Sequence, residues 1–187
     1  MRTLLLAGCL LAGGGGAAWA LPAVGDVAPA FDALDETGAR VTLAGFKGIP
    51  VVLYSYPADD TPGCTVEAKQ FSAARERLAA LGAVVLGVST QDAASHKAFK
   101  EKYGLNFPLL VDPEHKLMKA YGFSSGGAYA ARMTVLIGPD GKVAAVWPTV
   151  KVQGHDEEVL AALEKLLPKK AAPAPAPAKA APAPARK

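Results

Sequence analysis

The segment 61–65 has the sequence TPGCT, and it follows the apolar run 51–56 after a short loop. Its cysteine, Cys64, stands where a loop is expected to become a helix. A thiol at a helix N-terminus faces unpaired backbone N–H groups and the positive end of the helix dipole, and both favour the thiolate. The alternative is a buried cysteine that acts as a small hydrophobic residue. The residues around Cys64 favour redox chemistry.

The surroundings of Cys64 exclude ordinary dithiol exchange. A dithiol oxidoreductase normally has two cysteines separated by two residues, and the residue three after Cys64 is Glu67. Pro57 and Thr61 are placed to form the wall of a small pocket over the sulfur, where the Thr61 hydroxyl can share a hydrogen bond with a bound oxygen. Arg132, which opens a later predicted strand, can reach the same pocket and supply a fixed cation.

Alternating apolar segments are expected to position these residues. Buried strands are predicted at 51–56, 83–89, 107–111, 132–137 and 142–147, and helices at 64–81, 92–103, 113–121 and 156–167. This order predicts an α/β protein with a thioredoxin-like fold, in which a central mixed sheet has helices on both faces. In such open sheets, active sites lie just beyond the C-terminal ends of the strands, where the loop 57–63 is expected.

The spacing of Pro57, Thr61 and Cys64, with the distant Arg132, resembles the active-site signature of the peroxiredoxins, enzymes that reduce hydroperoxides with a cysteine thiolate. The resemblance extends over roughly residues 21–167, and the TPGCT motif is similar to that of the bacterioferritin comigratory (Q-type) subgroup. It implies a thiol-dependent peroxidase without a metal or other cofactor. The catalytic residues that it implies are Cys64, Thr61, Arg132 and Pro57, and the substrate-binding residues are Gly63 and Tyr56.

The sequence departs from that subgroup at the resolving cysteine. Many members have this cysteine five residues after the catalytic one, where this chain has Lys69, and others have it on the next helix, near Lys100. The resemblance therefore implies a one-cysteine cycle, in which Cys64 becomes a sulfenic acid and an external thiol reduces it. That thiol would be thioredoxin-like, glutaredoxin-like or of low molecular weight. The alternative is a non-catalytic thioredoxin-like peroxide sensor that signals through a mixed or intermolecular disulfide of Cys64.

Approximate rate factors indicate which groups contribute most to the rate of peroxide reduction. Full ionisation of an ordinary thiol adds only about 30-fold at neutral pH, and part of that gain is lost because nucleophilicity falls with basicity. The larger share is assigned to Arg132, Thr61 and the backbone N–H groups of the Gly63–Cys64 turn, which orient the peroxide and stabilise the departing oxygen. Replacing Arg132 or Thr61 is therefore predicted to lower turnover by more than the lost thiolate explains.

Other residues have less defined roles. Glu67 is expected either to contact Arg132 or to lie on a solvated helix face, and it is left out of the predicted site. The three histidines have no metal-binding spacing and are predicted to be surface or turn residues: His96, His115 and His155. A further suggestion is that the pocket is apolar enough for lipid hydroperoxides because of Tyr56, Phe123 and Met133.

The two ends of the chain differ in composition from the middle. Residues 1–20 contain a charged start, an apolar stretch and small residues before a predicted cleavage after Ala20, which is typical of a secretory signal. The chain is therefore expected to be exported, to the periplasm. The alternative is a lipoprotein anchor at Cys9, which ends a lipobox-like LAGC segment. Residues 169–187 are alanine, proline and scattered cations, and they are predicted to form a disordered tail.

One domain remains, at 21–168, and its charge argues against nucleic acid as a partner. The chain has 20 basic and 17 acidic residues, but six of the basic ones lie in the signal and the tail. The domain therefore has 14 basic and 17 acidic residues, without the excess of basic residues that is typical of nucleic-acid-binding domains. It is expected to act on hydroperoxides as a monomer or a weak homodimer.

Overall fold

The computed structural model describes residues 20–123 and 127–167, so nearly all of the predicted signal segment and the whole predicted tail lie outside the described residues. Within these two ranges no helix is long and apolar enough to cross a membrane. The strands are β1 (Asp32–Asp35), β2 (Arg40–Thr42), β3 (Val51–Ser55), β4 (Val84–Ser89), β5 (Leu109–Val111), β6 (Met133–Ile137) and β7 (Val143–Trp147). The helices are η1 (Leu43–Phe46), α1 (Pro62–Ala80), α2 (Ala93–Tyr103), α3 (Lys116–Tyr121) and α4 (His155–Leu166).

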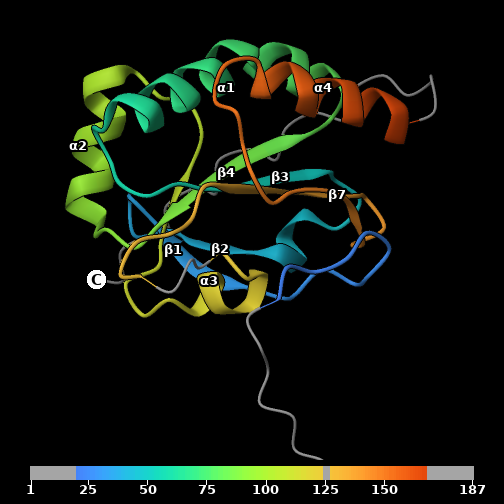
Figure 1. Cartoon of the computed structure of the whole chain (residues 1–187), viewed down its shortest axis with the longest axis horizontal. Helices are drawn as coiled ribbons and strands as arrows, with labels where there is room; N and C mark the ends of the chain where they lie inside the picture. Colours follow the sequence, from blue (N-terminus) through green and yellow to red (C-terminus); the bar gives the residue numbers. More distant parts are fainter. Residues whose placement is uncertain (1–19, 124–126, 168–187) are drawn as a thin grey trace, which may run out of the picture.

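The strands form one mixed sheet in the order β2-β1-β5-β4-β3-β6-β7 (Figure 1). β3 is parallel to β4 and antiparallel to β6, and all five of its residues are buried. Because β6 runs against β3, the C-terminal end of β3 and the start of β6 lie at the same edge, where Ser55 pairs with Met133. This edge is where the loop that leads to Cys64 meets the segment that contains Arg132.

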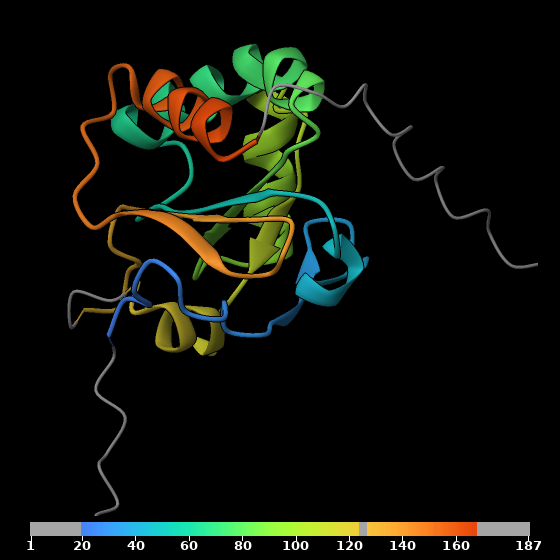
Figure 2. The same ribbon diagram turned by 90° about the vertical axis from the view of Figure 1, so that its right-hand side faces the viewer.

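Helices cover both faces of the sheet, which confirms the predicted thioredoxin-like architecture. Figure 2 shows α1 and α4 on one side and α3 on the other. The core cluster on the α1 face joins Tyr54 of β3 to Phe71 and Leu163, whereas the cluster on the α3 face joins Leu53 to Met118. Neighbouring residues of β3 thus point to opposite faces, as the pleat of a strand requires.

The hairpin of β1 and β2 was not predicted. Its strands are only four and three residues long, and most of their residues are exposed or half-buried, so they lack the apolar signal of a buried strand. The turn between them depends on Asp35, whose carboxylate accepts hydrogen bonds from the backbone N–H groups of Thr37 and Ala39 at 2.8 and 2.9 Å. A polar residue in a local turn therefore defines an element that hydrophobic periodicity misses.

The prediction that a helix begins at Pro113 is wrong by three residues. His115 has φ of 58°, in the left-handed region, which interrupts the helical backbone until Lys116. Asp112 still provides a hydrogen-bond acceptor for the start of α3. Its carboxylate accepts hydrogen bonds from the backbone N–H groups of Lys116 and Met118 at 2.7 and 2.9 Å.

Candidate active site

Cys64 lies in the first turn of α1, which begins at Pro62. The first helical hydrogen bond of this turn runs from the Thr65 N–H to the Thr61 carbonyl at 2.9 Å. Cys64 is only 2% exposed and belongs to the core cluster on the α1 face. Its sulfur nevertheless has a polar partner, because Nη2 of Arg132 donates to Sγ at 3.1 Å. A cation in contact with the sulfur stabilises the thiolate.

The position of Arg132 depends on β3. Arg132 directly precedes β6, and the Ser55 hydroxyl contacts the backbone carbonyls on both sides of it, at 2.6 Å from Ala131 and 3.3 Å from Met133. The guanidinium forms two contacts at once: Nη2 with Cys64, and Nη1 with the carboxylate of Glu67. Its side chain is 20% exposed. The site therefore has a fixed cation that is mostly shielded from water.

Glu67 is part of this arrangement, although the sequence analysis left it out. It lies one turn after Cys64 on the same face of α1 and is 1% exposed, so the solvated-face alternative is wrong. One carboxylate oxygen pairs with Arg132, and the other has no hydrogen-bond partner among the residues that the structure describes. Burial raises the pKa of Glu67 to about 7, against the lowering effect of Arg132. A sequence signal existed, because Glu67 precedes Phe71, a residue of the predicted apolar face, by one helical turn.

Thr61 is the residue before α1, and its hydroxyl does not cap the helix. The hydroxyl donates to the Ala58 carbonyl at 3.0 Å, within the loop that also contains the half-buried Pro57. Because this bond uses the hydroxyl proton, the Thr61 oxygen presents lone pairs that can accept a hydrogen bond from a peroxide O–H. A Cβ added at Gly63 would lie 3.3 Å from Nη2 of Arg132, so this glycine lets the guanidinium approach closely.

Known proteins resemble this chain in sequence and in fold. Residues 24–146 match the AhpC/TSA family. The putative peroxiredoxin Bcp of Coxiella burnetii is 42% identical over 147 residues, which cover 75% of this chain and 97% of that protein. Peroxiredoxin Bcp of Bacillus subtilis is 41% identical over 150 residues, which cover 76% and 96% of the two chains. The chain belongs to the AhpC/TSA family, as a Bcp/Q-type peroxiredoxin.

Solved structures show the same fold for this peroxiredoxin. A cysteine-to-serine mutant of PrxQ from Xylella fastidiosa matches it with a TM-score of 0.73 at 32% identity, over 78% of this chain and 98% of that one. Peroxidoxin BcpB from Mycobacterium tuberculosis matches with the same TM-score at 30% identity, over 79% and 99% of the two chains. The predicted family and the predicted enzyme class, a thiol-dependent peroxidase, are confirmed.

Tyr56 of this peroxiredoxin was predicted to bind substrate. It is buried, and its hydroxyl donates to the Asp59 carboxylate at 2.8 Å. The suggested apolar pocket of Tyr56, Phe123 and Met133 is not formed, because these residues are divided between the two faces of the sheet. Tyr56 belongs to the cluster on the α1 face with Cys64, whereas the other two belong to the α3 face. Met133 pairs with Ser55, so it points to the opposite face from Tyr56, the residue after Ser55.

Two of the histidines are buried, contrary to the prediction. His96 contacts Asp59, and His155 contacts the Thr134 hydroxyl through Nε2 at 2.8 Å. Burial lowers the pKa of His155, which favours its neutral ring. His115 is half-buried and lies directly before α3, with a positive φ. Among the residues that the structure describes, no group of three or more His, Cys, Asp or Glu could hold a metal ion.

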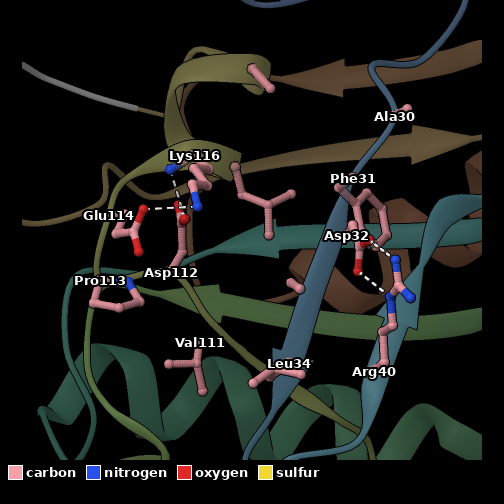
Figure 3. Close-up of a pocket in the computed structure, with 13 residues that line it drawn as sticks. Ala30, Phe31, Asp32, Leu34, Arg40, Val111, Asp112, Pro113, Glu114 and Lys116 are labelled. Atoms are coloured by element: carbon pink, nitrogen blue, oxygen red, sulfur yellow. Dashed lines mark hydrogen bonds and ion pairs between the residues drawn. The ribbon is translucent and has the colours of Figure 1, made fainter.

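A groove of about 600 Å³ lies between β1 and α3 (Figure 3). Its lining includes Phe31 and Leu117, which belong to the core cluster on the α3 face, whereas Cys64 belongs to the cluster on the α1 face. The groove is therefore separate from the cysteine site. Two ion pairs lie at the groove and are drawn in Figure 3: Asp32 with Arg40, and Glu114 with Lys116.

Gly63→Ala is expected to lower the second-order rate constant for hydrogen peroxide modestly, by less than about 10-fold. The added Cβ must displace the end of the Arg132 side chain by a few tenths of an ångström, since it would lie 3.3 Å from Nη2. Stopped-flow oxidation of the reduced protein measures this constant. Gly127→Ala is the control, because a Cβ there meets nothing within 4 Å. A rate unchanged at both positions would show that the exact placement of the guanidinium is unimportant.

Proposed function

We propose that this peroxiredoxin reduces hydrogen peroxide and organic hydroperoxides by a one-cysteine cycle at Cys64, which an external thiol completes. The proposal rests mainly on the 3.1 Å contact between Arg132 and the sulfur of Cys64. It is supported by the cysteine content, because Cys64 is the single free cysteine of the described residues and the sequence contains only one other, Cys9.

In the first half of the cycle the Cys64 thiolate attacks one peroxide oxygen. The S–O bond forms as the O–O bond breaks, the sulfur loses two electrons, and the departing oxygen takes up a proton and leaves as water or an alcohol. Arg132 stabilises the negative charge as it passes from the sulfur to the departing oxygen. Glu67 keeps the guanidinium in place, and the lone pairs of Thr61 orient the peroxide O–H.

In the second half one external thiol attacks the sulfenic acid, releases water and forms a mixed disulfide with Cys64. A second thiol then breaks that disulfide and regenerates the Cys64 thiol, so two thiols are oxidised for each peroxide. Because the sulfur is almost completely covered, a low-molecular-weight thiol can approach with less rearrangement than a protein thiol. Parallel assays with glutathione, a glutaredoxin and a thioredoxin would identify the reductant class.

The test uses the full chain with Cys9→Ser, in which Cys64 is the only thiol. Mixed with excess hydrogen peroxide and dithiothreitol, this variant is expected to turn over many times. One equivalent of peroxide without a thiol is expected to add one oxygen atom to Cys64 by intact mass. If oxidation stalls after one event despite the dithiol, the protein is a sensor. If turnover needs Cys9, the one-cysteine cycle is wrong.

We further propose that the protein is exported to the periplasm and acts there as a monomer or weak homodimer, without nucleic acid as a partner. The charged start, the apolar stretch and the small residues up to Ala20 support export. Intact mass of the protein from its native host is expected to show a chain that begins at Leu21. A chain that begins at a lipid-modified Cys9 would support membrane anchoring instead. Sedimentation velocity at micromolar concentration tests the oligomeric state.

A further inference from the structure

A buried polar cluster attaches the loop between β3 and α1 to the rest of the fold, and its centre is Asp59, a residue of that loop. The Asp59 side chain is only 4% exposed, yet its carboxylate accepts three hydrogen bonds. The donors are Ser95 Oγ at 2.6 Å, His96 Nδ1 at 2.8 Å and the Tyr56 hydroxyl at 2.8 Å. Burial raises the pKa of Asp59, but these donors outweigh burial and hold it below its usual value. Asp59 is therefore a buried anion with its partners in place.

His96 connects this anion to the body of the fold. Its ring is fully buried on α2, with Nδ1 facing Asp59 and Nε2 lying 3.2 Å from the Leu110 carbonyl of β5. The backbone N–H of Asp59 also donates to Gln91 Oε1 at 2.5 Å, in the connection between β4 and α2. The loop is thus attached directly to α2 and to the connection before it, and through His96 to β5. Buried polar networks of this kind are rigid when every member is satisfied.

The next residue, Asp60, is held in an unusual backbone conformation. Its φ is 57°, which is left-handed and unfavourable for a residue other than glycine. Its carboxylate accepts from Lys102 Nζ at 2.6 Å and from the Tyr103 hydroxyl, both at the end of α2. Such conformations are energetically unfavourable and persist only where the surroundings enforce them. The chain is therefore constrained on both sides of the Asp59–Asp60 peptide, directly before Thr61.

We infer that Asp59 and His96 are positioning residues, which hold the loop so that the Thr61 hydroxyl presents a peroxide to Cys64 in the reactive geometry. Neither residue contacts the reacting sulfur in the structure, so their effect passes through the loop. The inference rests on the proposed function. Because a misplacement of about 1 Å can cost about 100-fold in rate, a partial loss of this constraint is expected to cost about 10-fold.

The first test compares two substitutions of one residue. In His96→Asn the amide nitrogen takes the place of Nδ1 and can still donate to Asp59, whereas in His96→Gln it takes the place of Nε2 and can donate only toward Leu110. If the contact with Asp59 positions the loop, His96→Asn retains the rate constant for hydrogen peroxide within about 3-fold, while His96→Gln loses about 10-fold. Equal rates for the two variants, at similar melting temperatures, would overturn the inference.

The second test is a double-mutant cycle. Asp59→Asn is expected to slow the reaction about 10-fold in the wild-type chain, but by less than about 2-fold when Thr61→Val is already present, because the loop then has no hydroxyl left to place. If the rate losses of the two single variants multiply in full in the double variant, the inference is overturned. Glu36→Gln is the control for stability alone. Glu36 is a buried carboxylate that pairs with Lys100 of α2 and accepts from the Leu109 N–H at 2.9 Å, without contacting the loop.

The wild-type chain and Cys64→Ser separate this inference from the proposed function. If the wild type does not turn over peroxide, or if Cys64→Ser does, the proposed function fails. If the wild type turns over, Cys64→Ser does not, and the variants at Asp59 and His96 react at the wild-type rate, only the positioning role fails.

Discussion

Replacing Arg132 with lysine is expected to lower the second-order rate constant for hydrogen peroxide by about 100-fold. Lysine keeps the positive charge but not the planar fork with which arginine donates to Cys64 and Glu67 at the same time. An ammonium group beside the Glu67 carboxylate would be drawn away from the sulfur and from the departing oxygen. Stopped-flow oxidation of the reduced protein measures the loss.

The thiolate fraction of Arg132→Lys, followed by ultraviolet absorbance against pH, is expected to change much less than the rate. This difference separates stabilisation of the departing oxygen from ionisation of the sulfur. Arg77→Lys is the matched control, because Arg77 forms an exposed ion pair with Glu157 at 2.9 Å, far along α1. A rate for Arg132→Lys that falls only as far as the thiolate fraction would contradict the assigned role.

Glu67→Gln is expected to remove a large part of the pH dependence of stability. Burial raises the pKa of Glu67 from 4.5 to about 7, so the folded protein binds a proton more tightly there than the unfolded chain does. Its contribution to stability is therefore present below pH 4.5 and lost as the pH rises through about 7. Over this interval the wild type is expected to lose about 3 kcal/mol of unfolding free energy that Glu67→Gln keeps.

Urea unfolding at several pH values between 4 and 8 measures this difference. Glu76→Gln is the control, since Glu76 lies on the exposed face of the same helix and its substitution is expected to leave the pH dependence unchanged. Parallel pH profiles for the wild type and Glu67→Gln would show that the carboxyl has an ordinary pKa, and that the pair with Arg132 offsets its burial.

The centre of the site was predictable because it depends on local patterns and strand order. Cys64 follows a buried strand and lies in the first turn of a helix, and both features follow from apolar periodicity and from the proline of the motif. Arg132 directly precedes a strand of the same sheet, so two residues 68 positions apart were assigned to one pocket. The fold was predicted for the same reason, apart from the short, polar hairpin of β1 and β2.

The polar partners of the site were not predictable in this way. A carboxylate on a helix is normally exposed. Glu67 is buried because it pairs with Arg132, which lies 65 residues later in the sequence. The burial of His96 likewise requires polar partners from the loop before α1 and from β5. Side-chain partners that come from separate elements leave no periodic signal, and such a residue resembles a surface residue until its neighbours are known.

The antiparallel pairing of β3 with β6 has a consequence for how this chain can change in evolution. Because successive residues of a strand face opposite sides, a one-residue slip between the two strands would send Arg132 to the far side of the sheet. An insertion near 127–131 that caused such a slip would therefore abolish reactivity and would also exchange the buried residues of β6 between the two core clusters. The turn between β6 and β7, at 138–142, lies at the opposite end of β6, and length changes there leave this pairing untouched.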